Sequence, residues 1–392
     1  MLRFFCAEQP VPTPQELTAR VHGAGPTGAL AALALADAGW TVRLQDPLAP
    51  NQLCDRSRAY ALTHSSQELL EDLGLWPRLQ SALAPFRRLE LCDRATRQQV
   101  AFLGSDLGSG RSDAVGWILE HAPLMQVLLQ AAQSHPLIQL ELGSALVDLD
   151  ASQDLCVAAD GHHSATREAC GIPHWRLPYR QGCLTVQVRL RGSDPDQAWE
   201  LFRPEGPFAV LPLGGNAFQL VWSAPLSRLR QLEQLDGVAF LNALSSALPE
   251  ELQVEVVLDQ PRAFPVAAEL AWPFHRGRTV LLGEVAHRCH PVGGQGLNLC
   301  WRDVADLRQL AARCQQGQLP LSRLGRHYTR RRWLDIALVL LATDALVRLF
   351  SNRSPLLLPL RRIALFLLGR FRWLRQLSLR AMSDGPCRLW MN

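Results

Sequence analysis

The sequence predicts an α/β protein in which a parallel sheet is interrupted by a mostly antiparallel sheet and followed by a basic helical tail. A glycine-rich turn joins an apolar run ending at Val21 to an Ala/Leu-rich stretch from Ala29 to Ala38, as in a parallel βαβ unit. Alternating apolar residues between 177 and 264 indicate antiparallel strands. Apolar residues three and four apart after residue 355 indicate helices.

The composition is that of a globular protein. The chain has 392 residues, 48% hydrophobic and 19% charged, enough for two domains and an appendage. Its ten cysteines include no C-x-x-C pair, and the first residues lack a basic region followed by a continuous apolar stretch. Charges interrupt every apolar window long enough to span a membrane. We therefore expect a cytoplasmic protein without a transmembrane anchor.

The glycine-rich turn is Gly23-Ala24-Gly25-Pro26-Thr27-Gly28, and Asp46 ends the next predicted strand, Thr41 to Gln45. This G-x-G-x-x-G pattern, between a strand and a helix and with an acid about 20 residues on, is typical of dinucleotide binding. Gly25 lets the backbone approach a pyrophosphate, and Asp46 can accept hydrogen bonds from ribose hydroxyls. The sequence therefore predicts that an adenine dinucleotide binds at Gly23, Gly25, Gly28 and Asp46.

A second glycine-rich loop follows a short apolar strand, Thr279 to Leu282. Its glycines permit close backbone approach, and the helical periodicity from Leu297 to Ala312 aims unpaired N–H groups at the same place. A helix N-terminus stabilises an anion by roughly 0.3–1 kcal/mol, which suits the negatively charged edge of a reduced flavin ring. The residues expected to contact this ring are Gly293, Gly294, Gln295, Gly296, Leu297 and Asn298.

A third motif completes a resemblance. Asp160-Gly161 lies in Val157 to Arg167, and together with the two glycine loops it resembles the class A flavoprotein monooxygenases, within which the match narrows to the ubiquinone-biosynthesis hydroxylases. The matching segments extend from residue 20 to about residue 385 in the expected order. The further cues are Arg58-Ala59-Tyr60-Ala61-Leu62, Gly206 to Pro212, Arg262-Ala263-Phe264-Pro265, Tyr328 to Arg332, Asp335, Thr343-Asp344 and Leu349-Phe350.

The resemblance implies a Rossmann-type FAD-binding domain with an inserted antiparallel β-sheet substrate domain and C-terminal helices, the PHBH-like fold. The implied boundaries are 1–176 and 265–319 for the FAD-binding domain, 177–264 for the substrate domain and 320–392 for the helical segment. It also implies that Arg58 contacts flavin or pyrophosphate, that Asp160 and Gly161 contact FAD and the nicotinamide, and that Pro291 lies beside the flavin as the one catalytic position.

Two departures from the superfamily pattern concern the flavin site. Position 284 usually carries Asp, which accepts from a ribityl hydroxyl, and here it is Glu284, one methylene longer. The superfamily often places Arg, Gln or Asn facing the flavin near residues 118 to 129, where Glu120 and His121 are both open candidates. We expect Glu284 to keep the ribityl contact.

The implied activity is hydroxylation of an aromatic ring through a flavin C4a-hydroperoxide, with O₂ as co-substrate and NAD(P)H or a separate reductase as electron donor. The implied substrate is a small hydrophobic aromatic molecule, a prenylated phenol or quinone precursor, and a quinone-biosynthesis complex is an implied partner. Two alternatives stay open, namely an FAD-dependent isoprenoid reductase or epoxidase and a non-catalytic flavin- or lipid-binding assembly subunit. We expect no nucleic-acid partner.

Charge is concentrated in the tail. Residues 320–392 carry 14 Arg and 3 Asp, a net +11, so the remainder carries 4 − 11 = −7. Two readings of this tail stay open: a helix on an anionic membrane surface, at the inner face of the membrane, and a helix packed on the FAD domain with a solvated basic face. The apolar arc is Ile363, Phe366, Leu367, Phe371, Leu374 and Leu377, and the basic arc is Arg361, Arg362, Arg372, Arg375 and Arg380.

Other functional side chains have ordinary structural explanations. His287, Cys289 and His290 are metal ligands by type, but no further acid or thiol stands at ligand spacing, so we predict no metal. Four aromatic residues on predicted strands are candidates for a substrate cavity, although aromatic residues on strands are more often plain core: Tyr60, Phe208, Trp222 and Phe264.

Overall fold

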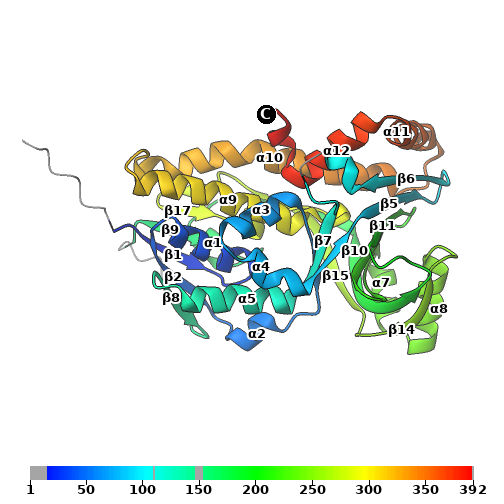
Figure 1. Cartoon of the computed structure of the whole chain (residues 1–392), viewed down its shortest axis with the longest axis horizontal. Helices are drawn as coiled ribbons and strands as arrows, with labels where there is room; N and C mark the ends of the chain where they lie inside the picture. The colour runs from blue at the N-terminus through cyan, green and yellow to red at the C-terminus, as the bar shows by residue number, and fades with distance from the viewer. Residues whose placement is uncertain (1–15, 109–110, 146–152, 391–392) are drawn as a thin grey trace, which may run out of the picture.

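The computed structural model describes residues 16–108, 111–145 and 153–390. Figure 1 shows the parallel sheet and its helices at one end of the molecule, and a larger, mostly antiparallel sheet at the other end. The long helix α10 (Leu321–Phe350) runs along both parts (Figure 1). The predicted α/β class with an inserted sheet is confirmed.

The parallel sheet has the strand order β16-β17-β9-β1-β2-β8. Between its described strands, only the β16–β17 pair is antiparallel. Its strands are β1 (Thr18–His22), β2 (Thr41–Asp46), β8 (Ile138–Leu142), β9 (Leu155–Ala158), β16 (His275–Arg276) and β17 (Thr279–Leu281). Because the carboxyl ends of parallel strands meet at one edge, β1, β2, β9 and β17 deliver both glycine loops and the Asp-Gly motif to the same place.

Helix α1 (Pro26–Asp37) is buried on nearly every side, because it lies between this sheet, α5 (His121–Ser134) and α9 (Gln295–Gln315). Alanine and leucine therefore suit all of its faces, and no polar stripe is needed. Pro26 occupies the first turn, where a missing N–H is tolerated. This arrangement places the start of α1 directly after β1 at the carboxyl edge of the sheet.

The larger sheet has nine strands within the described residues, in the order β18-β15-β10-β13-β12-β11-β5-β6, with β14 also paired to β10. Its strands are β5 (Arg88–Asp93), β6 (Gln98–Leu103), β10 (His174–Arg191), β11 (Gln197–Phe202), β12 (Phe208–Gly214), β13 (Ala217–Pro225), β14 (Gln253–Val257), β15 (Arg262–Ala271) and β18 (His287–Arg288). β12 and β13 form a hairpin around Gly214 and Gly215, and both glycines have positive φ.

The strands of this sheet come from more of the chain than the predicted segment 177–264. β5 and β6 derive from the stretch assigned to the FAD-binding part, and β15 continues to Ala271. β5 pairs with β11 in parallel, through a long-range contact that leaves no local sequence signal. The substrate sheet is therefore assembled from three separate stretches of chain.

The two faces of the substrate sheet differ. On the outer face, Phe208 and Val210 pack in a core with α7 (Leu226–Glu233) and α8 (Gly237–Ala247). Phe208 and Trp222 are fully buried there, so these two cavity candidates are core residues. On the inner face, Ala209, Leu211 and other alternate residues are only half-buried, which indicates accessible space between this face and the FAD-binding part.

A small antiparallel sheet, β3-β7-β4, packs against β12 on the inner face. Its strands are β3 (Ala59–Leu62), β4 (Leu83–Phe86) and β7 (Gly116–Glu120). The nearby helices and 3₁₀ turns are α2 (Pro50–Cys54), α3 (His64–Asp72), α4 (Trp76–Leu79), η1 (Gln80–Ala82) and η2 (Gly104–Leu107). The small sheet thus joins the FAD-binding part to the substrate sheet.

After α10, the tail forms η5 (Pro355–Leu357), α11 (Leu358–Arg370), α12 (Arg372–Asp384) and η6 (Pro386–Trp390). Figure 1 shows α11 and α12 beside β5 and β6. No helix among the described residues has the length and apolarity needed to span a bilayer.

One residue of the predicted basic arc of the tail is wrong. Arg361 is fully buried and donates to the carbonyls of Leu349 (2.7 Å) and Asn352 (3.1 Å), because the end of α10 leaves carbonyls without helical partners. The tail packs through Leu365 and Leu379 instead. Most of the predicted apolar arc faces outward.

Candidate active site

The turn after β1 has two glycines packed tightly against backbone and one glycine beside open space. A Cβ on Gly23 would lie 2.4 Å from the Ala159 carbonyl oxygen, and one on Gly28 would lie 1.8 Å from the Gly23 oxygen. A Cβ on Gly25 would meet nothing within 4 Å. Gly23 and Gly28 therefore serve close backbone packing, and Gly25 borders open space at the N-terminus of α1, where an anion is favoured.

Asp46 holds this turn in shape. It is buried, its Oδ2 accepts from the Ala24 N–H at 2.7 Å, and its Oδ1 accepts from the Leu48 N–H at 2.8 Å. An ionised carboxylate has about four acceptor positions, so two remain for ribose hydroxyls. The predicted ribose role of Asp46 stays a prediction, and its structural role is now explicit.

The carboxylate of Asp160 is directed into its own loop. Its Oδ1 accepts from the Ser164 hydroxyl at 2.5 Å, and its Oδ2 accepts from the Thr166 N–H at 3.1 Å and hydroxyl at 3.0 Å. These bonds fix the turn into α6 (Ala165–Ala169). Gly161 has φ +84° and no atom within 4 Å of its Cβ position, so it presents open backbone at the same edge of the sheet.

The second glycine loop runs through η3 (Gly283–Val285) and η4 (Val292–Gly294) into α9. Gly293 and Gly294 have φ +69° and +62°, a region that disfavours side chains. Pro291 is half-buried at the start of η4, and its carbonyl accepts from the Gly294 N–H at 3.0 Å. Gly296 has open space at its Cβ position. The first turn of α9 therefore exposes its backbone to a ligand.

The Asn298 side chain joins this loop to β3 and the start of α3 through hydrogen bonds. Its Oδ1 accepts from the Thr63 N–H (3.0 Å) and the Ser66 hydroxyl (2.7 Å), and its Nδ2 donates to the carbonyls of Ala61 (2.7 Å) and Gly294 (2.9 Å). These partners use the capacity of the amide side chain. Any contact of Asn298 with a flavin is therefore left to its backbone N–H, and the side chain positions the loop against β3.

A buried network of charged side chains, centred on Asp303, holds the second glycine loop in place. Asp303 on α9 is fully buried; its Oδ2 accepts from His287 Nε2 (2.7 Å) and the Gly283 N–H (3.0 Å), and its Oδ1 accepts from Arg332 Nε (2.7 Å). Burial alone would raise the pKa of Asp303, but His287 and Arg332 outweigh it and hold the pKa below its ordinary value. His287 is thus committed to Asp303, which explains it without a metal.

Arg58, Tyr60 and Glu284 share one electrostatic environment at the open side of the loop. The Arg58 guanidinium lies 5.2 Å from the centre of the Tyr60 ring. Burial raises the pKa of Tyr60, Arg58 opposes this, and Glu284 adds to it. Arg58 and Glu284 are both exposed. The cation predicted to contact flavin or pyrophosphate and the acid predicted to contact ribityl therefore border the same accessible space.

Tyr60 and His121 form a pair that the sequence did not reveal. The ring nitrogens of His121 lie 2.9 Å from the Tyr60 hydroxyl and 2.7 Å from the Leu53 carbonyl. The carbonyl accepts from Nε2–H, so Nδ1 accepts from the tyrosine. Burial lowers the pKa of His121, which favours this neutral form. Of the two residues left open by the sequence, His121 therefore supports β3, and Glu120 is the exposed one.

His290, next to Pro291, is also neutral. Burial lowers its pKa to about 4, and its Nδ1 accepts from the Val292 N–H at 3.2 Å. Its ring meets Tyr179 edge to face at 5.2 Å, and the Tyr179 hydroxyl donates to Asp344 at 3.1 Å. This chain of contacts ties the Pro291 turn to α10 and accounts for the Thr343-Asp344 cue.

These features fit FAD. Open backbone at Gly25, Gly161 and Gly296 meets at one edge of the parallel sheet, beside the N-termini of α1 and α9. Among the residues that the structure describes, the buried Gln295 Oε1 has no hydrogen-bond partner, and Leu297 is half-buried on the same turn. Gly23, Gly28, Gly293 and Gly294 shape the cradle, and Gly25, Gly161 and Gly296 leave open backbone there. Contact of this backbone with the cofactor stays a prediction.

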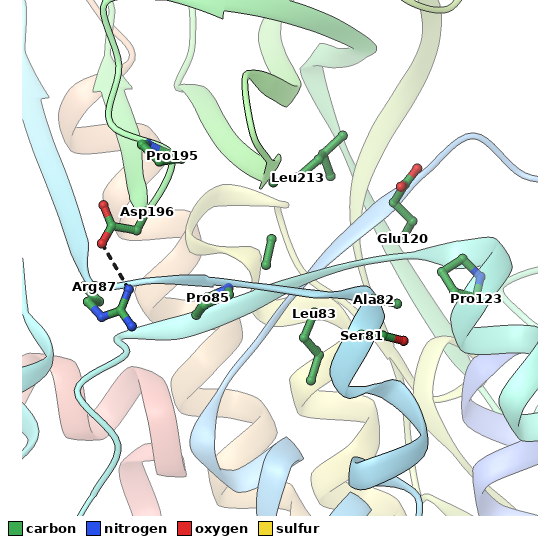
Figure 2. Close-up of a pocket in the computed structure, with 12 residues that line it drawn as sticks. Ser81, Ala82, Leu83, Pro85, Arg87, Glu120, Pro123, Pro195, Asp196 and Leu213 are labelled. Atoms are coloured by element: carbon green, nitrogen blue, oxygen red, sulfur yellow. Dashed lines mark hydrogen bonds and ion pairs between the residues drawn. The ribbon is translucent and has the colours of Figure 1, made fainter.

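A cavity of about 570 Å³ lies apart from this cradle. Figure 2 shows it between the small sheet, at Leu83 and Pro85, and Leu213 of the substrate sheet, with Glu120 at one end. The Arg87–Asp196 ion pair, at 3.2 Å, borders the other end. Neither the glycine turn nor the α9 loop lines it. It therefore lies at the rim of the inner face and not at the dinucleotide site.

Comparison with known proteins decides the family. A family model described as FAD binding domain matches residues 16–153 and 147–339, well over half of the chain. The chain belongs to this FAD-binding family. The two matched segments include both glycine loops, which form the cradle in the structure.

Relatives with similar sequences match most of this chain. The chain is 29% identical over 390 residues to the 3-demethoxyubiquinol 3-hydroxylase of Escherichia coli, and the match covers 94% of this chain and 98% of that protein. It is 27% identical over 416 residues to the human mitochondrial ubiquinone biosynthesis monooxygenase COQ6, covering 86% of each.

Solved structures show the fold. PqsL of Pseudomonas aeruginosa, in complex with 2-aminobenzoylacetate, superposes with a TM-score of 0.75 at 18% identity, over 90% of this chain and 100% of that one. The p-nitrophenol 4-monooxygenase PnpA of Pseudomonas putida gives 0.75 at 15% identity, over 94% and 98%. These structures confirm the predicted PHBH-like fold. The family model and the sequence relatives confirm the enzyme class, an FAD-dependent monooxygenase of the aromatic-hydroxylase type.

Glu284→Ala is expected to weaken FAD binding. Glu284 is exposed and close enough to Arg58 and Tyr60 to interact with both, and loss of one charge-assisted hydrogen bond costs about 1.5–3 kcal/mol, or roughly 10- to 150-fold in the dissociation constant. Titration of apoprotein with FAD measures this. Glu284→Asp restores the usual superfamily residue and should stay close to wild type. Unchanged affinity in Glu284→Ala would show that this carboxylate points away from the ribityl chain.

Proposed function

We propose that this chain hydroxylates the aromatic ring of a prenylated phenol or a related quinone precursor. The observation that carries the proposal is the inner side of β12, where Ala209, Leu211 and Leu213 are apolar and only half-buried, beside a cluster that includes Val292 of the α9 loop. A hydrophobic aromatic molecule suits such a face, since burying apolar surface there is favourable. The names of the relatives, hydroxylases of ubiquinone synthesis, agree with this substrate class.

The roles of the residues follow from their positions. The start of α1 at Gly25 and the Asp46 carboxylate would hold pyrophosphate and ribose, and Arg58, Asp160, Gly161 and Glu284 would border the rest of the cofactor. Once reduced, FAD supplies the electrons that activate O₂ for transfer of one oxygen atom to the ring. Pro291 and the loop behind it would keep water from the ring and fix its face, and the electron donor would be NAD(P)H or a separate reductase.

The test is oxygen labelling. Reduced, FAD-loaded protein is incubated with prenylated phenols under ¹⁸O₂, and the products are analysed by mass spectrometry. A labelled ring hydroxyl is expected. Reduced or epoxidised side chains would support an isoprenoid reductase or epoxidase, and absence of any turnover would support a non-catalytic assembly subunit.

The outward face of α11 and α12 supports attachment to the inner face of the membrane, close to a lipid-dissolved substrate. Phe366 and Trp373 are 59% and 60% exposed. Leu356, Leu360, Ile363, Phe371 and Leu377 are also exposed on this segment. Exposed arginines flank them at positions 353, 362, 370, 372 and 380. An apolar surface edged by Arg fits an anionic lipid surface, where each Arg contributes about 1 kcal/mol before screening.

Replacing Arg362, Arg370 and Arg372 by Gln is expected to weaken binding to anionic vesicles by about 10- to 100-fold at low salt, without changing FAD content. Flotation with vesicles that contain phosphatidylserine measures this. A matched triple variant removes the same charge elsewhere, at the exposed Arg43, Arg78 and Arg230. Equal loss in both variants, or no flotation of the wild type at low salt, would argue against a specific membrane face and for a packed structural tail.

A further inference from the structure

Glu200 is a buried carboxyl group at the junction of the α9 loop and the substrate sheet. It lies on β11, and its Oε2 accepts from the Gly293 N–H at 3.4 Å. Within the described residues it has no other hydrogen bond and no ion-pair partner. A carboxyl in such a place is costly to bury unless something else compensates it.

The strand register places Glu200 in a row across the inner face. Glu200 pairs with Ala209, Ala209 with Val221, and Val221 with Thr185. Ala209, Val221 and Thr185 are half-buried, whereas their neighbours on the outer face are fully buried. Glu200 therefore ends a mostly apolar row that borders accessible space and reaches the loop carrying Pro291.

Few other charges face this carboxyl. Asp93, on the neighbouring strand β5, is occupied by the Thr96 hydroxyl at 2.8 Å and lies 4.0 Å from Arg361. The Cys183 thiol on β10 is close enough to interact with Glu200 and with Arg58, and the η4 turn contributes backbone only. Burial raises the pKa of Glu200 to about 7, and the Gly293 N–H offsets this only in part.

We propose that Glu200 accepts the hydrogen bond of the substrate's phenolic hydroxyl and takes up its proton during hydroxylation. This inference rests on the proposed function. It assigns the acid–base group of the reaction to the substrate sheet, although the sequence motifs all lie around the cofactor. A phenol held at Glu200 would lie against the row of Ala209 and Val221, at the loop that Gly293 forms.

The proton balance is simple. One oxygen atom of O₂ bonds to a ring carbon ortho or para to the hydroxyl while the O–O bond breaks, and the two electrons of reduced FAD take the other oxygen atom to water. The hydroxyl oxygen of the substrate becomes a carbonyl, and its proton passes to a Glu200 oxygen. The ring carbon then loses its own proton to water, and Glu200 returns its proton to the carbonyl oxygen. The ring ends with one new hydroxyl, and Glu200 ends ionised as it began. General-base help of this kind contributes about 10²- to 10⁴-fold.

The test is the pH dependence of Glu200→Gln. In the wild type, kcat/KM for a prenylated phenol should rise about tenfold per pH unit below 7 and level off above, because only the ionised carboxylate can accept the proton. In Glu200→Gln this rise should vanish and kcat should fall about 100-fold. Equilibrium dialysis of the phenol against oxidised, FAD-loaded protein should show binding that tightens through pH 7 only in the wild type. Glu200→Asp keeps an ionisable group and should retain the rise.

Glu90→Gln is the matched control. Glu90 is a buried glutamate on β5 that pairs with Trp199, so it faces the opposite side of the same sheet, and it is bound to Arg88. This variant should keep the wild-type pH profile. If Glu200→Gln keeps that profile, or loses FAD while turning over normally per bound flavin, Glu200 only anchors Gly293 and the inference is overturned. A wild type that neither binds nor hydroxylates any phenol overturns the proposed function itself.

Discussion

Gly25→Val is expected to give a folded protein that retains almost no FAD. No atom lies within 4 Å of the Cβ position, and φ of −65° suits any residue, so the fold should tolerate the side chain. The added isopropyl group would instead fill the space for the pyrophosphate. Loss of two or more charge-assisted hydrogen bonds, each roughly 1.5–3 kcal/mol, lowers affinity by at least about 100-fold. Flavin absorbance per protein, with circular dichroism, measures both properties.

Gly237→Val serves as the matched control. Gly237 also opens a helix, has no atom within 4 Å of its Cβ position, and lies on α8, on the outer side of the substrate sheet. It should keep full FAD. Full flavin occupancy in Gly25→Val would mean that the turn after β1 does not hold the pyrophosphate.

Asp303→Ala is expected to lower the free energy of unfolding by about 3–5 kcal/mol, the cost of leaving buried partners uncompensated. The substitution strands His287 and the Gly283 N–H and removes one of the carboxylates that hold Arg332. Because the folded pKa of Asp303 is lowered, its stabilising contribution is present above the unfolded pKa and is lost as pH falls through the folded pKa. Urea unfolding at saturating FAD, near neutral pH and at pH values below 3.8, measures both effects.

Asp306→Ala provides the comparison on the same helix. Asp306 also binds Arg332, at 3.2 Å, but its side chain is 25% exposed. A partly exposed pair contributes little, so the loss should stay below about 1 kcal/mol. Similar losses for the two variants would show that Asp303 is an ordinary ion-pair partner and does not support the flavin loop.

Much of the cofactor cradle could be predicted because it is built from local backbone geometry. A strand-turn-helix unit is predicted by the spacing of Gly23, Gly25 and Gly28. A sheet with two different faces is predicted by the alternating apolar residues on β12. Such features depend on residues close in the chain, which sequence periodicity reports directly. The start of α9 was placed two residues late, at Leu297 and not at Gln295, as is usual for helix ends.

What could not be predicted depends on residues far apart in the chain. The joining of β5 to β11, the hydrogen bond between Asn298 and Thr63, and the pairing of Asp303 with Arg332 leave no periodic pattern. Arg361 looked like part of a solvated face because arginine is rarely buried, and only the carbonyls at the end of α10 explain it. Glu200 was missed because one carboxylate on a strand has no signal until the strand register places it beside Gly293.

We propose that cofactor and substrate meet between the α9 loop and the inner face of the substrate sheet. Titration of the oxidised, FAD-loaded protein with a prenylated phenol, followed through the flavin absorption spectrum, tests this meeting place. A saturable spectral shift is expected, with a midpoint equal to the dissociation constant from equilibrium dialysis. Binding of the phenol by dialysis with an unchanged flavin spectrum would place the substrate away from the flavin and rule this meeting place out.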